Sequence, residues 1–435
     1  MEKNRKNSRF WLALVIFSLT GQVAWVVENM YFNVFIYKMF NASAEAISAM
    51  VAASAAAATL TTLLIGALSD KVGKRKLFIC GGYILWGITI WSFALVRTEV
   101  IGVLFPAAAS AAAMGVSLTI ILDCVMTFFG SSANDACFNA WLTESADSAN
   151  RGAAEGVNSM MPLLAILVVF GGFMGFDLNE SGSWVTIFSV IGAVVIAIGV
   201  LGFFLIEDRA VKIAENEHYF ANIFYGFRPG VVKSNKTLYA GLLAFSVFNI
   251  SIQIFMPYLI LYYNVSLGLD NYVLIMAPAV LLAAVFTAFY GRVYDRKGFK
   301  ASVAPAVTLL MVGYVLLYFC RNMVPVFIGS LLMMCGYLAG MAVFGALVRD
   351  FTPENKAGMF QGLRICSQVL IPGIIGPAIG AAVLENAQQI LNDDGTYSFV
   401  PNENIFLAAF VAAVFIWFAL MVVLKCQKKE KNYAG

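Results

Sequence analysis

The apolar residues of this chain are gathered into long uninterrupted blocks, and this feature constrains the fold more than any other. Each block is about 20 residues or longer, enough at ~1.5 Å rise per residue to cross a ~30 Å hydrocarbon core. Of the 435 residues, 61% are hydrophobic and 12% charged, against roughly 45–50% apolar and ~25% charged in an ordinary soluble domain. The pattern predicts an all-α membrane protein.

The blocks predict twelve transmembrane helices, and an even number returns the C-terminus to the side of the N-terminus. On that shared side lie 24 of the 28 Lys and Arg residues. The positive-inside rule therefore predicts a multi-pass protein of the cytoplasmic (inner) membrane with both termini cytoplasmic. The predicted spans lie near residues 10–38, 45–69, 76–97, 112–143, 152–175, 183–206, 237–264, 271–292, 299–320, 323–349, 357–384 and 403–425.

The longest polar interval divides the spans into six and six. We predict an N-terminal six-helix bundle over 1–206, a cytoplasmic linker over 207–236, and a C-terminal six-helix bundle with a short basic tail over 237–435. No cleavable signal is expected, because the first apolar block is too long and lacks a small-residue cleavage site.

The two predicted halves repeat a loop motif, Gly-x3-Asp-x2-Gly followed by basic residues. One copy follows the second span and the other follows the eighth, 225 residues later. A repeat at matching places is typical of transporters built from two related halves. The motif residues are Gly66, Asp70 and Gly73, with Arg75 after them, and Gly291, Asp295 and Gly298.

A second pair of matching segments follows the fourth and tenth spans, over 144–156 and 350–362. Each has an acid at a helix end, a turn, and then Gly-x3-Gly opening the next helix. Together, the paired loops resemble the signature of the major facilitator superfamily, over essentially the whole chain. The resemblance implies two pseudo-symmetric six-helix bundles and a secondary transporter that works by alternating access.

The same resemblance implies that the loop motifs form gates at the cytoplasmic mouth. Asp70 is expected to meet a helix start near Gly358 and the base Arg151, and Asp295 is expected to meet Gly152 and Lys356. The physical basis is an anion against the positive end of a helix dipole together with an ion pair. The predicted gating residues are Gly66, Asp70, Gly73, Arg75, Arg151, Gly291, Asp295, Gly298 and Lys356.

Ionisable groups inside the spans are functional candidates, because each costs about 2.5–3.5 kcal/mol or more at mid-bilayer. Three are acids, Glu28, Asp123 and Asp135. A carboxyl group in a low-dielectric medium favours its neutral form, so any of the three is a candidate proton carrier. Asp123 and Asp135 are twelve residues apart, or ~18 Å along a helix, and are not expected in one site.

The first span also carries a polar stripe at helical spacing: Gln22, Trp25, Asn29 and Asn33. The seventh span supplies Asn249 and Gln253. Two interpretations stay open. The side chains line a cavity for a polar, ring-shaped solute, or they form the amide hydrogen bonds that hold membrane helices together.

A narrower resemblance lies in the fourth span, where Asp135 to Leu142 is similar to the corresponding segment of the glycoside-pentoside-hexuronide cation symporters, the melibiose permease family. This likeness implies that Asp135 binds a sugar, with Asn139 beside it. Gln22 stands where that family has an acidic sugar contact. Met50 to Gly66 contains no charged residue, whereas that family uses an acidic pair there for cations, so a proton is expected rather than sodium.

Arg364 and Asn158 occupy matching positions in the two halves, each two residues after the second glycine of its repeat. Arg364 is either a clamp for an anionic substrate or the structural partner of Glu155 or Asp135. The predicted substrate-binding residues are Gln22, Trp25, Asn29, Asn33, Asp135, Asn139, Asn158, Asn249, Gln253 and Arg364.

These patterns predict a proton-coupled transporter for a sugar, glycoside or similar polar solute. An exporter of drugs or amphiphiles is the alternative, compatible with 14% aromatic residues and 18 methionines. A transport-dead receptor or sensor is the alternative from another class. No catalytic constellation, metal-ligand spacing or phosphate-cradling loop is apparent, so no enzyme, cofactor or metal is predicted. The expected partners are a small-molecule substrate, a proton and the lipid bilayer, without nucleic acid, for a monomeric protein.

Overall fold

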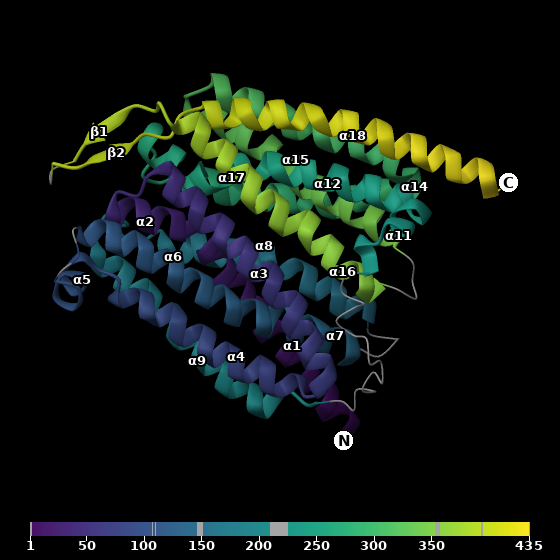
Figure 1. Ribbon diagram of the computed structural model, residues 1–435, viewed down its shortest axis with the longest axis horizontal. Helices are drawn as coiled ribbons and strands as arrows, with labels where there is room; N and C mark the ends of the chain where they lie inside the picture. Colours follow the sequence, from purple (N-terminus) through teal and green to yellow (C-terminus); the bar gives the residue numbers. More distant parts are fainter. Residues whose placement is uncertain are drawn as a thin grey trace. The chain divides into compact units, whose positions relative to one another are not determined.

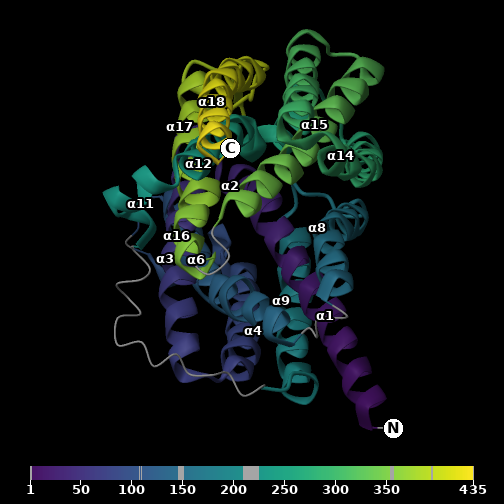
Figure 2. The same cartoon turned by 90° about the vertical axis from the view of Figure 1, so that its right-hand side faces the viewer.

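The computed structural model describes residues 2–106, 108, 110–145, 151–208, 225–352, 357–392 and 395–434. These form two compact units (Figures 1 and 2). The first unit holds residues 1–46 and 53–219, and the second holds 47–52 and 220–435. The predicted boundaries of the linker stay a prediction, because 209–224 lie outside the described residues.

In its described part the first unit has helices and no strand, and its helices run along one another between the end near the N-terminus and the end marked by α5 (Figure 1). Its elements are α1 (Glu2–Val26), η1 (Val27–Tyr31), α2 (Phe32–Phe40), α3 (Ala44–Val72), α4 (Arg75–Ser92), η2 (Phe93–Leu95), α5 (Thr98–Leu104), α6 (Ala111–Gly130), η3 (Ser131–Phe138), α7 (Asn139–Ser145), α8 (Arg151–Phe173) and α9 (Ser181–Leu205).

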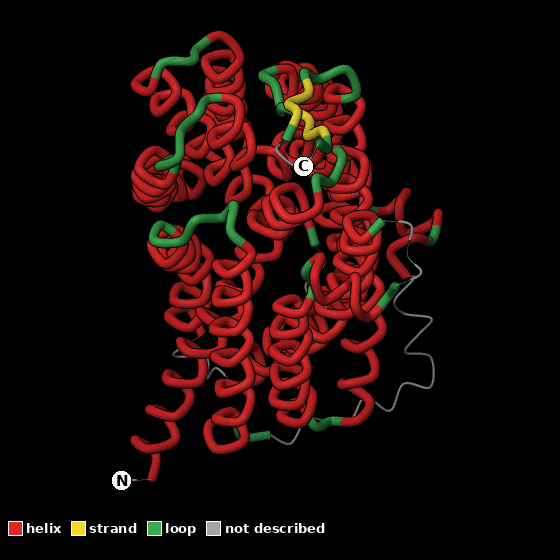
Figure 3. The backbone as a smooth tube through the Cα atoms, turned by 90° about the vertical axis from the view of Figure 1, so that its left-hand side faces the viewer, coloured by secondary structure: helices red, strands yellow, loops and turns green. Residues whose placement is uncertain are grey.

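The second unit has helices and one small hairpin, drawn as the strands of Figure 3. Its elements are η4 (Tyr225–Phe227), α11 (Pro229–Ser234), α12 (Lys236–Phe255), η5 (Met256–Tyr258), α13 (Leu259–Leu261), η6 (Tyr262–Ser266), α14 (Val273–Phe319), α15 (Met323–Phe351), α16 (Ala357–Ile365), η8 (Cys366–Leu370), α17 (Ile371–Leu384), β1 (Gln389–Leu391), β2 (Tyr397–Phe399) and α18 (Asn404–Ala434).

The two units repeat the same helix pairings. In the first unit α1 packs against α8 and α9, and in the second α12 packs against α17 and α18. In each case the first long helix of the unit contacts the last two. The internal repeat seen in the loop motifs therefore extends to the packing of the helices.

Four of the long helices contain a short π-helical segment instead of running as α-helix throughout. These segments are η1 after α1, η3 after α6, η6 after α13 and η8 after α16. A π-helix has i→i+5 hydrogen bonds, so each segment inserts an extra residue and rotates the helix that follows it. Two of the three predicted span acids, Glu28 in η1 and Asp135 in η3, lie in such segments.

The described residues contain eleven helices long and apolar enough to cross a membrane, against the twelve predicted. The difference comes from α14, whose 47 residues cover both the eighth and the ninth predicted spans. A helix of that length is ~70 Å long, more than twice the ~30 Å hydrocarbon core. Its backbone is non-helical at Gly298, with φ 73° and ψ −179°. The other predicted spans each coincide with one of the eleven helices.

The hairpin between α17 and α18 was not predicted from the sequence. Its two strands are antiparallel, with Leu391 opposite Tyr397, and both of these side chains are exposed. Each strand has three residues, and this is too short for a period-two pattern to be distinguished from a loop.

Labelling of introduced cysteines tests whether α14 crosses the membrane once or twice. In a version without the native cysteines, Asn271→Cys and Asn322→Cys should both react with an impermeant reagent on intact cells. Lys297→Cys should react only after permeabilisation, because a double crossing leaves the middle of α14 in cytoplasmic water. All three side chains are exposed. Glu180→Cys and Lys74→Cys are the outside and inside controls. Labelling of positions 271 and 322 from opposite sides would mean a single crossing.

Candidate functional site

Glu28 lies at the centre of a polar cluster inside the first unit. Its side chain is buried, with 7% exposed. The Ser54 hydroxyl donates to Glu28 Oε1 at 2.6 Å, and the Thr127 hydroxyl donates to the same oxygen at 2.9 Å. The two hydroxyl oxygens are themselves 2.9 Å apart. Side chains from η1, α3 and α6 thus meet at one carboxyl oxygen.

Asp123 completes this acid–hydroxyl cluster, which we define as Glu28, Ser54, Asp123 and Thr127. Asp123 is 2% exposed. It interacts with the Glu28 carboxyl and with the Ser54 hydroxyl. One oxygen of each acid, Glu28 Oε2 and Asp123 Oδ1, is buried without a hydrogen-bond partner. Among the described residues, no salt bridge involves either acid.

Asp135 lies in a second polar network, on η3. Its carboxyl accepts hydrogen bonds from Ser131 at 3.1 Å and from the Asn134 amide at 3.2 Å. Asn134 Oδ1 in turn accepts a hydrogen bond from the Tyr83 hydroxyl at 3.0 Å. The Trp25 indole also interacts with the carboxyl, at longer range than a standard hydrogen bond. Asp135 is half-buried and combines a carboxylate, an amide and an aromatic ring.

The predicted stripe on the first span is wrong as a single face. Gln22 and Trp25 are half-buried, whereas Asn29 is exposed and Asn33 is 1% exposed. Asn29 and Asn33 donate to the backbone carbonyls of Trp25 and Asn29, at 2.8 Å and 3.2 Å. The π turn at η1 separates the two ends of the stripe, because the spacing rule assumes an uninterrupted α-helix.

The remaining candidates of the first unit divide between the two interpretations. Asn158 Oδ1 accepts a hydrogen bond from Ser18 at 2.5 Å, which ties α8 to α1 as a helix-to-helix contact. Asn139 is exposed and donates to the Asp135 carbonyl, at 3.2 Å, within its own helix. Asn139 is therefore compatible with a cavity, while Asn158 forms a contact between helices and its place in a substrate site stays a prediction.

In the second unit, Asn249 is buried and donates to the Phe245 carbonyl at 2.9 Å. Gln253 is half-buried beside Gly376. Arg364 is exposed, and its Nε donates to Gln368 at 3.3 Å; within the described part of the chain it forms no salt bridge. The place of these residues in a shared site remains a prediction.

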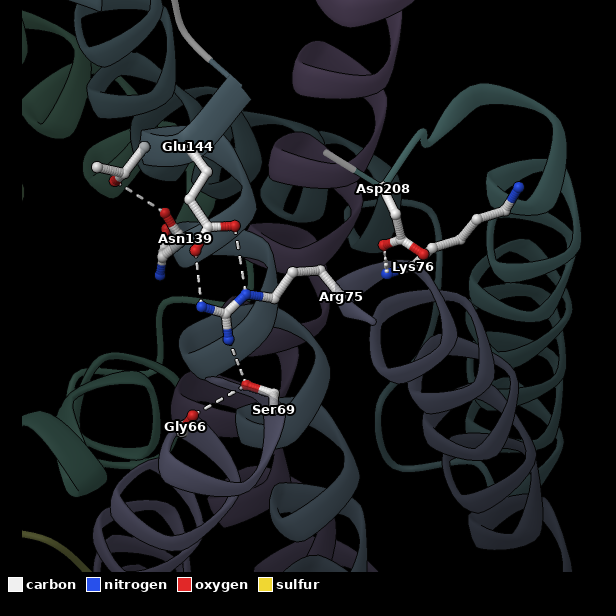
Figure 4. Close-up of polar contacts among 8 residues, drawn as sticks. Gly66, Ser69, Arg75, Lys76, Asn139, Glu144 and Asp208 are labelled. Carbon is white, nitrogen blue, oxygen red and sulfur yellow. Dashed lines mark hydrogen bonds and ion pairs between the residues drawn. The ribbon is translucent and has the colours of Figure 1, made fainter. Parts of the chain in front are cut away.

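The loop motif of the first unit is organised by Arg75 (Figure 4). Arg75 is 4% exposed. Its guanidinium donates to Glu144 Oε1 at 2.7 Å and to Glu144 Oε2 at 3.4 Å, and it also donates to the Ser69 hydroxyl. Ser69 donates in turn to the Gly66 carbonyl at 3.0 Å. The end of α3 is thereby linked to α7, in a contact that the sequence did not predict.

The second unit forms the equivalent link with different chemistry. The Tyr294 hydroxyl donates to Asp350 at 2.6 Å. Tyr294 stands 225 residues after Ser69, and Asp350 matches Glu144 in the second repeated pair. A tyrosine hydroxyl thus replaces the serine and the buried arginine of the first unit.

The second glycines of the two motifs share a positive φ but differ in ψ, which is 14° at Gly73 and −179° at Gly298. Gly73 has φ 67° and Gly298 has φ 73°, a region that favours glycine because it lacks a Cβ atom. The predicted Asp70 and Asp295 gates stay predictions. Asp295 is exposed, but the side chains of Asp70 and Arg151, and the whole of Lys356, lie outside what the structure describes.

Several residues of the site were missed from the sequence, namely Ser54, Tyr83, Thr127, Ser131 and Glu144 as the partner of Arg75. Ser54 is a small hydroxyl residue among alanines in a span without charges. Such residues usually bond their own helix backbone, so no local signal distinguishes one that reaches a neighbouring helix.

The comparisons with known proteins agree with this architecture. A model of the Major Facilitator Superfamily matches residues 10–377. The chain belongs to the major facilitator superfamily. It is a multi-pass membrane transporter of small solutes. The narrower likeness to the melibiose permease family is not shown by the comparisons, and no curated protein matches the sequence.

Solved superfamily transporters have the same fold at low sequence identity. A single-residue variant of the nucleoside transporter NupG matches with a TM-score of 0.72 and 14% identity, over 95% of this chain and 99% of that one. A bacterial homologue of the human lysosomal transporter Spinster matches with 0.69 and 15%, over 97% of both chains. The xylose transporter XylE from E. coli matches with 0.67 and 15%, over 94% and 97%.

Two adjacent glycines of α4 test the packing of the Asp135 segment. A methyl group at Gly82 would lie 2.6 Å from the Ala133 side chain, while one at Gly81 would meet nothing within 4 Å. Gly82→Ala should therefore destabilise the protein by ~1–3 kcal/mol. The matched control, Gly81→Ala, should be neutral or stabilising by up to ~1 kcal/mol. Thermal melting of the purified proteins measures the difference, and equal melting temperatures would contradict the packing of α4 on η3.

The Arg75–Glu144 contact makes a second prediction. Arg75→Met should destabilise the protein by ~1.5–3 kcal/mol, because it removes hydrogen bonds to a charged group. The control Lys74→Met removes a charge from the exposed neighbour and should have little effect. The double variant Arg75→Met with Glu144→Gln should lose less stability than the two single variants lose in sum, because no unpaired carboxylate remains. Additive losses in thermal melts would show that the contact contributes nothing.

Proposed function

We propose that this superfamily member is a secondary active transporter that takes up a sugar, glycoside or similar polar organic solute, coupled to protons, by alternating access. The observation that supports this most is the Asp135 network. Its carboxyl is half-buried beside the Asn134 amide and the Trp25 indole. A carboxylate and an amide suit the hydroxyl groups of a sugar, and an aromatic ring suits its apolar ring face.

The structural neighbours give secondary support. Their names include a nucleoside transporter and a D-xylose-proton symporter, and both of those substrates contain a sugar ring. The identities of 14–15% show a common fold, so the substrate class comes to this chain from the Asp135 network. The segment from Asp135 to Leu142, which resembles the melibiose permease family, lies in the same place.

The proposed topology has twelve spans in two six-helix bundles, with α14 crossing twice around Gly298. Both termini lie in the cytoplasm of a cell whose inner membrane holds the protein as a monomer. The distribution of basic residues supports this orientation. With it, the Arg75–Glu144 and Tyr294–Asp350 contacts lie at the cytoplasmic ends of their units, where they stabilise each unit as a rigid body.

The proposed substrate residues of the second unit are Gln253 and Arg364. Arg364 has a free guanidinium edge in the described part of the chain, because only its Nε bonds to Gln368. It is suited to a carboxylate or phosphate on the substrate, as in a hexuronide. The Asp70 and Asp295 gates act on the conformational equilibrium in this proposal.

Binding to purified protein tests the substrate class. A panel of sugars, uronides, nucleosides and lipophilic cations should give a sugar-containing ligand as the tightest. Asp135→Asn should then weaken that binding by ~1.5–3 kcal/mol, roughly ten- to more than a hundredfold, through loss of a charge-assisted hydrogen bond. Asp177→Asn, the same change at an exposed loop acid, is the control and should bind normally.

Accumulation in vesicles with an imposed pH gradient tests the coupling. The ligand found by binding should accumulate against its gradient only when the gradient of protons is present. If lipophilic cations bind most tightly, and the protein moves them away from the cytoplasmic side of the vesicle membrane, the result would support the exporter instead. Binding without any transport would support the receptor.

A further inference from the structure

We propose that Glu28 and Asp123 hold one proton between them, which passes from one acid to the other through the Ser54 hydroxyl. This pair, and not Asp135, is then the coupling-proton site. The statement that this proton drives transport rests on the proposed function. The shared proton itself is independent of any substrate.

The burial of the two acids favours the binding of one proton by the cluster. Glu28 and Asp123 are 93% and 98% buried, from exposed fractions of 7% and 2%, and each has one buried oxygen without a hydrogen-bond partner. Asp123 lies one helical turn before Thr127 on α6, and the Thr127 hydroxyl is 2.9 Å from Glu28 Oε1. Two ionised carboxylates placed in this way in a low-dielectric interior repel each other, and within the described residues no salt bridge compensates them. One bound proton removes the repulsion and leaves the pair with one negative charge.

The hydroxyl groups decide where that negative charge rests. Ser54 and Thr127 both donate to Glu28 Oε1, at 2.6 and 2.9 Å, and donors stabilise an ionised carboxylate. For Asp123, by contrast, Ser54 is the one hydroxyl that interacts with the carboxyl in the described structure, and Asp123 Oδ1 has no hydrogen-bond partner. In this arrangement Glu28 is the anion and Asp123 carries the proton.

Ser54 connects the two acids because its hydroxyl has one hydrogen and two lone pairs. Its hydrogen is donated to Glu28, so its oxygen is free to accept from a protonated Asp123. When the Asp123 proton moves onto the Ser54 oxygen, the original Ser54 hydrogen moves to Glu28 Oε1. One O–H bond breaks and one forms at each step, and the net result is one proton moved from Asp123 to Glu28.

The relay requires a well-aligned hydrogen bond between Asp123 and the Ser54 oxygen, and hydrogen bonds of this kind tighten when a site is loaded. Thr127 is a positioning residue, because it holds Glu28 Oε1 and lies 2.9 Å from the Ser54 oxygen. Ser54 comes from α3, and Glu28 and Asp123 come from the first and fourth spans. Movement of α3 relative to its neighbours would therefore open or close the relay.

Two other titratable groups interact with the pair in the described structure, Asp135 and Cys124. Asp135 has donors of its own in Ser131 and Asn134, so its ionised form is stabilised separately. Along α3, the span from Met50 to Gly66 contributes no charged group. Asp135 is thus free to bind substrate while the pair holds the proton.

Infrared difference spectroscopy of the purified protein in lipid vesicles tests the shared proton without a substrate. On a change of pH, the wild type should show the carbonyl-stretch band of one buried protonated carboxyl group. Asp123→Asn and Glu28→Gln should each shift or abolish that same band, because the proton belongs to the pair. Two independent bands, each removed by only one variant, would overturn the sharing.

Substitution of the relay residue tests the path. Ser54→Ala should keep a protonated carboxyl group but slow proton-driven accumulation of the ligand about tenfold or more, while equilibrium binding of that ligand stays within about twofold of the wild type. Ser132→Ala is the matched control, because this buried serine donates only to the Phe128 carbonyl of its own helix, at 2.6 Å. Normal accumulation by Ser54→Ala would overturn the relay.

Two further arms separate this inference from its rivals. Replacing choline chloride with sodium chloride should leave the band unchanged. Loss of the band would show that the pair takes sodium, and would overturn the proton assignment.

If no substrate from the panel binds or accumulates, the proposed function fails, but the band and its response to Asp123→Asn remain. Loss of proton coupling in Asp135→Asn with the band intact would overturn the division of roles between Asp135 and the pair.

Discussion

A carboxyl group inside a lipid-embedded helical bundle must find its polar partners within the protein, and much of the first unit is arranged around this constraint. Glu28 obtains donors from two other helices through Ser54 and Thr127. These short hydrogen bonds fix how α1, α3 and α6 face one another. Because Glu28, Ser54 and Thr127 are buried, each hydrogen bond contributes more than it would at a surface, and a missing one costs more.

The π-helical segments set the direction in which the Glu28 and Asp135 side chains leave their helices. Glu28 and Asp135 both lie in segments where the i→i+5 pattern interrupts the α-helix, and such bulges occur frequently at functional sites. Close approach of the neighbouring helices supports them. Gly21 lies so near Asn134 and Tyr83 that a methyl group there would be 2.5 Å from Asn134 Oδ1. The helices can approach this closely only because the residue has no side chain.

The two halves of the transporter share a positive φ at one glycine of the loop motif and differ in the side-chain chemistry around it. Gly73 and Gly298 share the positive φ that ends the loop motif. In the first unit the buried Arg75 links the motif to Glu144, and in the second unit the Tyr294 hydroxyl links it to Asp350. A buried ion pair binds more strongly and is more costly to break than a neutral donor on a carboxylate. The halves therefore differ in how firmly their loops are held.

Hydropathy, charge and the loop repeat determined that the chain is a multi-pass membrane protein and carried the superfamily resemblance, because these are properties of short stretches of sequence. They also found Glu28, Asp123 and Asp135, since any ionisable residue in a span stands out. Only the tertiary structure decided that Glu28 meets Ser54 and Asp123, that Asn33 is buried while Asn29 is exposed, and that Arg75 reaches Glu144. Partners on different helices depend on how each helix is rotated about its axis, and a single residue inserted by a π turn changes that rotation by about 100°.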